Sequence, residues 1–361
     1  SMIITFPNLG NMSVLLSVLM REWGIPFIMP PKTTRNTLSL GSRYAPPDAC
    51  LPMKIVLGNF IEGHMAGADT AVFLGGKGPC LFGCFSEMIR LALEENSIPL
   101  EVLRIETNMD GAKDAFNLIK KMSGKSTFEI LSPLPEGMRS CTLLDLLENR
   151  FLLIRSTIED EERRKAFNSF EDGVFKLLRN ARSFIELTAL IRASFDEAER
   201  FKGGRESILC VGIVGDIYTT IDADANAKLQ RKLADMGVYS ERSMTINKWF
   251  RGKISLSPFG WKWHSKPYIE KGIGGFARQT VGYAAMWSRS VDGIIQIHPL
   301  NCMPEVVAKS ILDAIMRDFR VPFLSLVLDE LSGDLGYITR LEAFCDLLEA
   351  NKKNDELLAR N

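Results

Sequence analysis

The chain has 361 residues, enough for two domains of ordinary size. Hydrophobic residues make up 46% of it and charged residues 24%, as in soluble globular proteins. Because 44 Lys and Arg balance 44 Asp and Glu, net charge gives no attraction to nucleic acid or to anionic membranes. The apolar runs are also far shorter than the roughly 20 residues that span a bilayer. We therefore expect neither nucleic acid nor a membrane as a partner.

Residues 1–135 alternate between short apolar runs and amphipathic stretches, a pattern typical of a parallel sheet with right-handed crossovers. The expected strands are Ile3–Phe6, Pro26–Met29, Ala71–Leu74 and Val102–Ile105, and the expected helices are Met12–Trp23, Leu51–Ala66, Phe85–Glu94 and Gly111–Met122. We predict a loop between Met29 and Cys50, where Thr33, Thr34, Pro46 and Pro47 lie. The segment is predicted to be an N-terminal α/β domain.

Residues 136–204 carry apolar side chains at helical spacing and no strand pattern, which predicts a helical bridge. Residues 205–361 return to the alternating pattern, which predicts a second α/β domain. Its expected strands are Ser207–Gly215, the segment after Gly237, Gly293–His298 and Pro322–Leu328, and its expected helices are Ala223–Met236, Phe276–Trp287, a helix after Cys302 and Thr339–Asn351. We expect an irregular, aromatic segment over 250–268. The fold class is thus two Rossmann-like (flavodoxin-like) parallel-sheet domains with a helical bridge.

Seven cysteines are too few for a disulfide scaffold, and a strand-like start without a basic leader predicts the cytoplasm, where thiols stay reduced. Cys141, Cys210 and Cys345 fall within apolar patterns and are expected to be inert. Cys50 and Cys302 each precede a proline and a predicted helix. The other two, Cys80 and Cys84, lie in a glycine-rich turn between a strand and a helix.

A thiol at the N-terminus of a helix is stabilised as a thiolate by the helix dipole and by unpaired N–H groups. Several such thiols fit an iron–sulfur cluster, whose sulfides those N–H groups would hydrogen-bond. Paired C-x₂-C motifs of a zinc knuckle are absent from the sequence, and so is a Walker A motif. From spacing alone, incidental cysteines in an ordinary α/β protein are an equal alternative.

Three motifs resemble those of one superfamily: Asp48–Lys54, Gly78–Gly83 and Asn301–Glu305. The C-terminal segments Leu328–Glu330 and Thr339–Phe344 resemble it too. That superfamily contains 2-hydroxyacyl-CoA dehydratase components, double-cubane cluster proteins and CoA protein activase-like relatives. The resemblance implies an oxygen-sensitive iron–sulfur protein of anaerobic metabolism. It also implies a separate ATP-hydrolysing [4Fe–4S] activator as electron donor, and Cys50, Cys80 and Cys302 as ligands.

The chain departs from the superfamily at Lys77, where some relatives have a cysteine, and at Leu81 and Cys84, where an arginine and an aromatic residue are common. A double-cubane [8Fe–9S] cluster requires about six cysteines, so a single [4Fe–4S] cluster is preferred. Two arrangements stay open, with Cys84 as a fourth ligand or with one iron left for substrate.

Other candidates lie beside these cysteines. His298 ends a predicted strand shortly before Cys302 and is a candidate for hydrogen bonding to the cluster or for proton donation, with a structural role as the alternative. Lys54 would either balance cluster charge or be solvated, and Glu305 is explained by the helix dipole. Asp216 and Tyr218 end another strand, where they could contact a substrate.

The sequence predicts the electron-accepting, reductase- or dehydratase-like component of an ATP-dependent electron-transfer system, as a homodimer or a heterodimer. The alternative is a non-catalytic scaffold subunit that carries a cluster or zinc on the same thiols.

Overall fold

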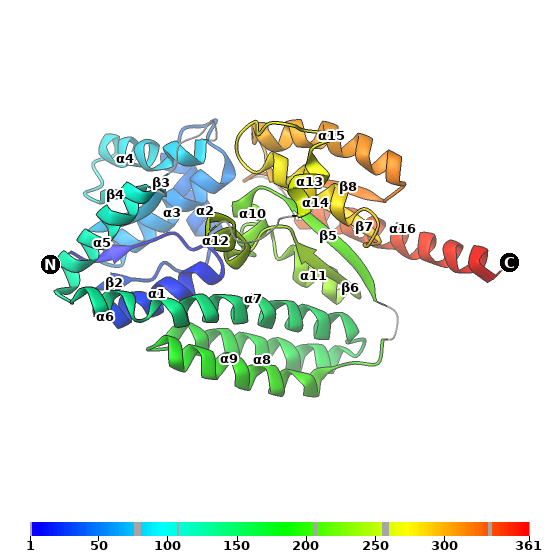
Figure 1. Ribbon diagram of the computed structural model, residues 1–361, viewed down its shortest axis with the longest axis horizontal. Helices are drawn as coiled ribbons and strands as arrows, with labels where there is room; N and C mark the ends of the chain where they lie inside the picture. The colour runs from blue at the N-terminus through cyan, green and yellow to red at the C-terminus, as the bar shows by residue number, and fades with distance from the viewer. Residues whose placement is uncertain are drawn as a thin grey trace. The chain divides into compact units, whose positions relative to one another are not determined.

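The computed structural model describes residues 2–75, 81–106, 108–205, 208–254, 260–330 and 334–360. It divides into two compact units, each of which takes part of the central helical segment. Unit 1 comprises Ser1–Leu144 and Gly173–Ala193, and unit 2 comprises Asp145–Asp172 and Ser194–Asn361. Each unit contains one four-stranded parallel sheet with helices around it, which confirms the predicted α/β class of two Rossmann-like domains (Figure 1).

The sheet of unit 1 has the strand order β2-β1-β3-β4. Its strands are β1 (Ile4–Thr5), β2 (Phe27–Ile28), β3 (Thr70–Gly75) and β4 (Glu101–Glu106). The strand β1 is central, because Ile4 is in register with Phe27 of β2 on one side and with Thr70 of β3 on the other. All four strands lie within or within one residue of the apolar runs that predicted them.

The helices of unit 1 include two that the sequence patterns did not predict, α2 (Arg35–Tyr44) and α6 (Thr127–Leu131). Those that precede the central segment are α1 (Asn11–Trp23), α2, α3 (Leu51–Met65), the 3-10 turn η1 (Leu81–Cys84), α4 (Phe85–Glu95), α5 (Met109–Ser123) and α6. The prediction of a loop over residues 30–49 is wrong, because α2 forms there. A capping box starts α2, in which Thr34 and Thr37 each accept a hydrogen bond from the other's backbone N–H.

Helices α2 and α3 pack unusually closely. A Cβ atom at Gly41 would lie 1.7 Å from the backbone oxygen of Lys54, and one at Gly58 would lie 2.0 Å from the backbone oxygen of Thr37. Glycine is therefore required at both positions for the two backbones to approach each other. This packing fixes the start of α3, which Cys50 precedes.

The central helical segment contains α7 (Leu134–Thr157), α8 (Glu161–Asn180), α9 (Phe184–Ala198) and the short η2 (Glu199–Phe201). The three long helices lie side by side in Figure 1. Within unit 1, Ser140 of α7 and Thr188 of α9 are hydrogen-bonded at 3.0 Å. In unit 2, the rings of Phe151 and Phe167 meet edge to face with centroids 5.7 Å apart.

The sheet of unit 2 has the order β6-β5-β7-β8, which is the order of the first sheet repeated. Its strands are β5 (Leu209–Gly215), β6 (Val238–Arg242), β7 (Gly293–Pro299) and β8 (Phe323–Leu328). Every residue of β7 is buried, as expected for a central strand of a sheet covered on both faces. Helices α14 and α15 supply much of this cover, because their apolar residues pack with Val214 and Ile294 in one core.

The helices of unit 2 differ from the prediction in several places, since α10 (Ile217–Ile221) was not predicted and α16 (Asp334–Arg360) is longer at both ends than the predicted Thr339–Asn351. They are α10, α11 (Leu229–Asp235), α12 (Ile246–Ile254), α13 (Gly260–Ser265), α14 (Ala277–Trp287), α15 (Met303–Phe319) and α16. The helix predicted from Ala223 begins only at Leu229, because residues 223–228 form turns. The segment expected to be irregular over 250–268 contains α13 and the end of α12.

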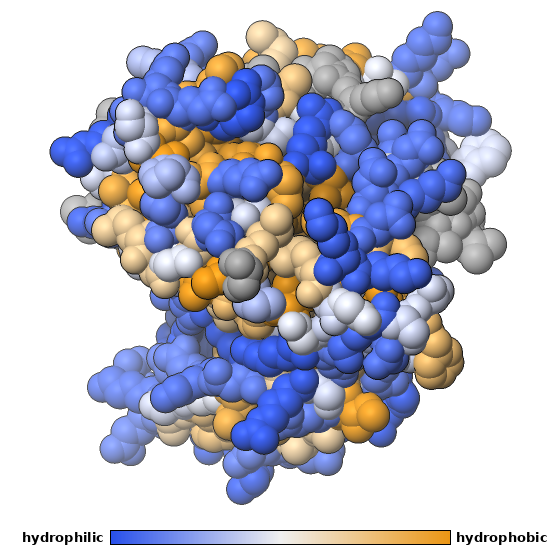
Figure 2. Space-filling model, turned by 90° about the vertical axis from the view of Figure 1, so that its left-hand side faces the viewer, coloured by the Kyte–Doolittle hydropathy of each residue, from blue (hydrophilic) through white to orange (hydrophobic). Residues whose placement is uncertain are grey.

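Within the described residues, no helix is both long enough and apolar enough to cross a bilayer. The face of the molecule drawn in Figure 2 carries hydrophilic side chains over much of its area, with apolar side chains between them.

Candidate functional site

The two sheets have their topological switch point at equivalent positions. The chain places the second strand of each sheet on one side of the first strand and the third strand on the other, so loops diverge at the carboxyl ends of β1 and β3, and of β5 and β7. Ligands of open α/β sheets bind at such points. In both units a cysteine-bearing turn follows the third strand.

Cys302 occupies the turn that follows β7. It is the N-cap residue of α15, with Pro304 in the first turn of that helix. Its backbone N–H donates to the Pro299 carbonyl at 3.2 Å, and Asn301 adopts the left-handed conformation with φ 67°. The turn thus places a half-buried cysteine at the positive end of a 17-residue helix, as the sequence predicted.

Cys50 is the N-cap residue of α3, with Pro52 in the first turn, so it also begins a helix as predicted. Its carbonyl accepts the backbone N–H groups of Met53 and Lys54, and the residue is half-buried. The Lys54 side chain is only 4% exposed, and its Nζ donates to the Pro47 carbonyl at 3.2 Å. Of the two alternatives for Lys54, surface solvation is therefore wrong, and a role in balancing cluster charge stays a prediction.

Cys84 is the N-cap residue of α4 and is exposed. Cys80, the other cysteine of the same turn, lies outside the described residues, as do Lys77 and the glycines Gly76 and Gly78. Because a crossover helix runs antiparallel to its strands, the N-termini of α3, α4 and α15 lie at the carboxyl edges of their own sheets. Three of the four predicted ligands therefore share one kind of position.

The cysteines that were expected to be inert lie in different surroundings. Cys141 and Cys345 are buried, and Cys210 lies half-buried within β5. Burial raises the pKa of the Cys345 thiol to about 11, and burial together with the Asp292 carboxylate raises that of Cys210 to the same value. These two thiols are protonated at neutral pH and are poor metal ligands.

Within the described ranges, no three side chains of His, Cys, Asp or Glu lie close enough together to hold a metal ion. In unit 1, Cys50 and Cys84 alone are too few for a cluster, and a complete set there requires Cys80. Cys302 belongs to unit 2. The chemistry of the donors fits an iron–sulfur cluster, because each described candidate is a thiol at a helix N-terminus.

Glu305 lies in the first turn of α15 and is completely buried, which the helix dipole alone does not explain. Thr280 Oγ1 of α14 donates to Glu305 Oε1 at 2.9 Å, and Gln296 Nε2 of β7 donates to Oε2 at 3.1 Å. Ser325 Oγ of β8 donates in turn to Gln296 Oε1 at 3.2 Å. Burial raises the pKa of Glu305 to about 7. This network, which the sequence did not predict, ties the start of α15 to β7, β8 and α14.

Asp216 directly follows β5 and is the N-cap residue of α10. Its carboxylate accepts the backbone N–H of Tyr218 at 2.7 Å and the hydroxyl of Thr219, so it caps α10. Burial raises the pKa of Asp216 to about 6. Tyr218 is buried as well. Neither side chain is exposed at the edge of the sheet as expected.

His298 is 2% exposed and lies at the carboxyl end of β7. Its Nδ1 donates to the Pro299 carbonyl at 2.9 Å, because that oxygen can only accept. Burial lowers the pKa of the imidazole, so the ring is neutral at pH 7 and its Nε2 carries a lone pair. In this tautomer Nδ1 is the donor, so the Nε2 atom can accept a hydrogen bond but cannot donate one.

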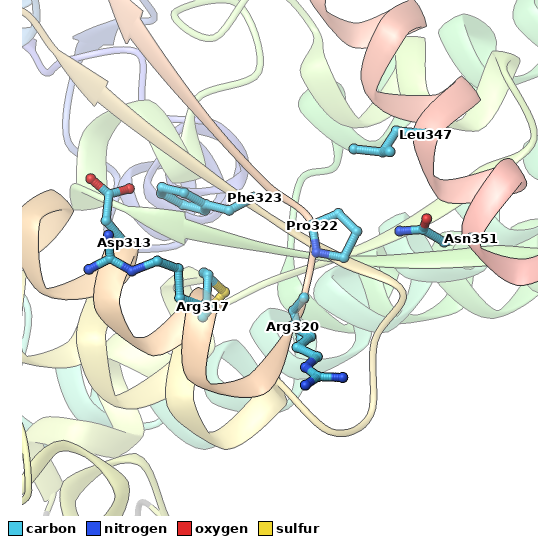
Figure 3. Close-up of a pocket in the computed structure, with 9 residues that line it drawn as sticks. Asp313, Arg317, Arg320, Pro322, Phe323, Leu347 and Asn351 are labelled. Atoms are coloured by element: carbon cyan, nitrogen blue, oxygen red, sulfur yellow. The ribbon is translucent and has the colours of Figure 1, made fainter. Parts of the chain in front are cut away.

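A surface pocket of about 400 Å³ lies at the far end of α15 from Cys302, where α15, β8 and α16 meet (Figure 3). Its floor is apolar, with Pro322 and Phe323 at the start of β8 and Leu347 of α16. Of its two arginines, Arg317 lies beside Asp313 and Arg320 points away from Pro322.

Comparison of the chain with models of known protein families gave no match, and comparison with curated protein sequences gave none either.

Proposed function

We propose that this chain is an iron–sulfur protein that takes ligands from Cys50, Cys80, Cys84 and Cys302. In this proposal it is the electron-accepting component of an ATP-dependent, low-potential electron-transfer system, acting as a reductase or dehydratase-like protein in the cytoplasm. The single observation that supports it most is the shared position of Cys50, Cys84 and Cys302. Each is the N-cap residue of a helix whose N-terminus lies at the carboxyl edge of the sheet in its own unit.

The chain's own contribution follows from that position. Unpaired N–H groups in the first turn of a helix stabilise a nearby thiolate and hydrogen-bond sulfide. Pro52 and Pro304 fix the first turns of α3 and α15 and remove one N–H that would lack an intrahelical partner. A bound [4Fe–4S] cluster would supply storage and transfer of single electrons.

The proposed partner is a separate ATP-hydrolysing [4Fe–4S] activator, since the sequence has no phosphate-binding Walker A loop. The resemblance of the Cys50, Cys80 and Cys302 motifs to 2-hydroxyacyl-CoA dehydratase components supports both the donor and the reaction class.

The test is anaerobic purification followed by iron and sulfide analysis and EPR spectroscopy after reduction with dithionite. About four irons per chain are expected for one cubane, and about eight would indicate a double cubane. Cys50→Ala and Cys302→Ala should each remove most of the iron and change or abolish the EPR signal. Cys345→Ala is the matched control and should leave both unchanged, because its thiol is buried and protonated.

Absence of iron from the wild-type protein under strictly anaerobic conditions would contradict the proposal. Stoichiometric zinc would do the same, and would favour the alternative of a scaffold subunit.

A further inference from the structure

The side chain of His298 faces the first turns of α15. Successive residues of a strand point to opposite faces of the sheet, so His298 shares a face with Gln296, two residues earlier on β7. Gln296 donates to the backbone and side chain of Glu305 on α15. Lys309, one turn further along α15, also acts on the imidazole and helps to lower its pKa. The ring thus lies on the side of the sheet where Cys302 begins α15.

One carbonyl group orients both residues. Pro299 O accepts the Nδ1–H of His298 at 2.9 Å and the backbone N–H of Cys302 at 3.2 Å. The imidazole and the cysteine are therefore fixed to the same atom of the turn. A backbone carbonyl on Nδ1 is the usual support of a histidine that binds metal through Nε2, because it fixes the tautomer and raises the basicity of the ligand.

The Nε2 atom is buried, and within the described ranges it has no hydrogen-bond partner. The other polar side chains at this position are satisfied, since Glu305, Gln296 and Thr280 bond to one another. A buried acceptor without a partner costs free energy, and proteins usually supply one or use the group for function.

We propose that His298 Nε2 is a nitrogen ligand of the metal centre to which Cys302 contributes its thiolate. The metal centre would then have mixed sulfur and nitrogen ligation. Nitrogen ligands in place of thiolates raise the reduction potential of iron–sulfur centres. This inference rests on the proposed function, which it deepens by adding a histidine ligand beside Cys302.

The chain has three histidines, which makes the assignment testable. His264 is the matched control: it lies in the same unit and its Nδ1 contacts the Gly260 carbonyl at 2.8 Å, but it is exposed. The experiment is pulsed EPR of the dithionite-reduced, anaerobically prepared protein labelled with ¹⁵N-histidine, for the wild type, His298→Gln and His264→Gln. Thermal unfolding of the two variants shows whether each remains folded.

We expect a ¹⁵N hyperfine coupling in the wild type and in His264→Gln, and its complete loss in His298→Gln. A reduced cluster without this coupling in the wild type would overturn the inference while leaving the proposed function intact. Persistence of the coupling in His298→Gln would overturn it as well.

If iron and sulfide analysis finds neither element in the wild type, that result contradicts the proposed function independently of the ¹⁵N measurement. His298 is then tested with Zn²⁺ alone by ¹⁵N NMR of the three histidines. Coordination should shift the Nε2 resonance of His298 and leave that of His264 unchanged, and equal or absent shifts would overturn the inference. His298→Gln should show reduced zinc binding if the assignment is correct.

Discussion

The two sheets of this protein have the same strand order, yet the groups at their carboxyl edges differ in kind. In unit 1 the loop after β1 is held by amides, because the backbone N–H of Asn8 donates to Asn59 Oδ1 at 3.0 Å. In unit 2 the corresponding region contains two buried carboxyl groups, Asp216 and Glu305, and the imidazole of His298.

The strands differ as well. Both β1 and β2 have two residues, whereas β5 and β7 have seven each and are almost completely buried. Among the described residues, unit 2 therefore has the longer central strands and the buried carboxyl and imidazole groups, while unit 1 has the exposed thiol of Cys84 and the close packing of α2 on α3. Sheet topology therefore determines where a site can form, and the side chains at the carboxyl edge of the sheet determine its chemistry.

The largest expected effect is a loss of stability in unit 2 alone, caused by a substitution of Arg155. Arg155 is 1% exposed and pairs with Glu171 and with Asp235, the latter at 2.9 Å, all within unit 2. Removing one member of a buried ion pair leaves its partners uncompensated, so Arg155→Ala should lower the free energy of unfolding of unit 2 by about 3–4 kcal/mol. Hydrogen exchange followed by mass spectrometry would locate the loss.

The matched control is Arg150→Ala, also on α7, whose ion pair with Glu199 is exposed to solvent. It should cost less than about 1 kcal/mol. Equal losses in the two variants, or a loss confined to unit 1, would contradict the role given to Arg155.

A somewhat smaller effect should appear in unit 1. Gly58→Ala places a methyl group 2.0 Å from the Thr37 backbone oxygen, which has to move, so α2 and α3 should separate at a cost of about 2–3 kcal/mol. In Gly173→Ala, on α8 of the same unit, a Cβ meets nothing within 4 Å. That variant should be stabilised by up to about 1 kcal/mol through helix propensity. Urea unfolding of both variants measures the difference, and a neutral Gly58→Ala would disprove the close packing.

The smallest effect is a pH dependence confined to unit 2. Burial raises the pKa of Glu305 from 4.5 to about 7, so the native state holds this proton more tightly than the unfolded state does. The resulting stability is complete below about pH 4.5 and is lost as pH rises through about 7. We expect unit 2 to lose about 2 kcal/mol between pH 5 and pH 8. Asp216 contributes in the same direction, because its pKa is also raised.

Glu305→Gln should flatten this dependence, since the amide does not titrate. Hydrogen exchange at pH 5, 6, 7 and 8 would measure it with unit 1 as the internal reference. An unchanged pH slope in the variant would show that Glu305 is not the group responsible.

The fold could be predicted because its strands are continuous apolar runs and its long helices have a clear period, as in Ile294–Ile297 and α1. The helix α2 was not predicted, because its side chains are mostly polar and its signal was a capping box of two threonines. Its existence depends on packing through Gly41 and Gly58, which no local pattern shows.

The candidate site was predicted in part for a similar reason. Local sequence placed Cys50 and Cys302 at the starts of helices, because N-capping is a local property, whereas it placed Cys84 only in a turn between a strand and a helix. Burial of Lys54 and Glu305 depends on residues distant in sequence, such as Thr280, which is why both were expected to be solvated or explained by their own helix. Cys80 lies outside the described residues, so its predicted role stays a prediction.

The division of the helical segment has a consequence for biosynthesis. Unit 1 is completed by Gly173–Ala193, which the ribosome makes only after Asp145–Asp172 of unit 2. Unit 1 therefore cannot finish folding as soon as its own sheet has emerged. The segment Asp145–Asp172, in α7 and α8, must wait for Ser194–Asn361, which completes unit 2. Neither unit can be produced by a single cut in the gene, because each is built from two separate segments of the chain.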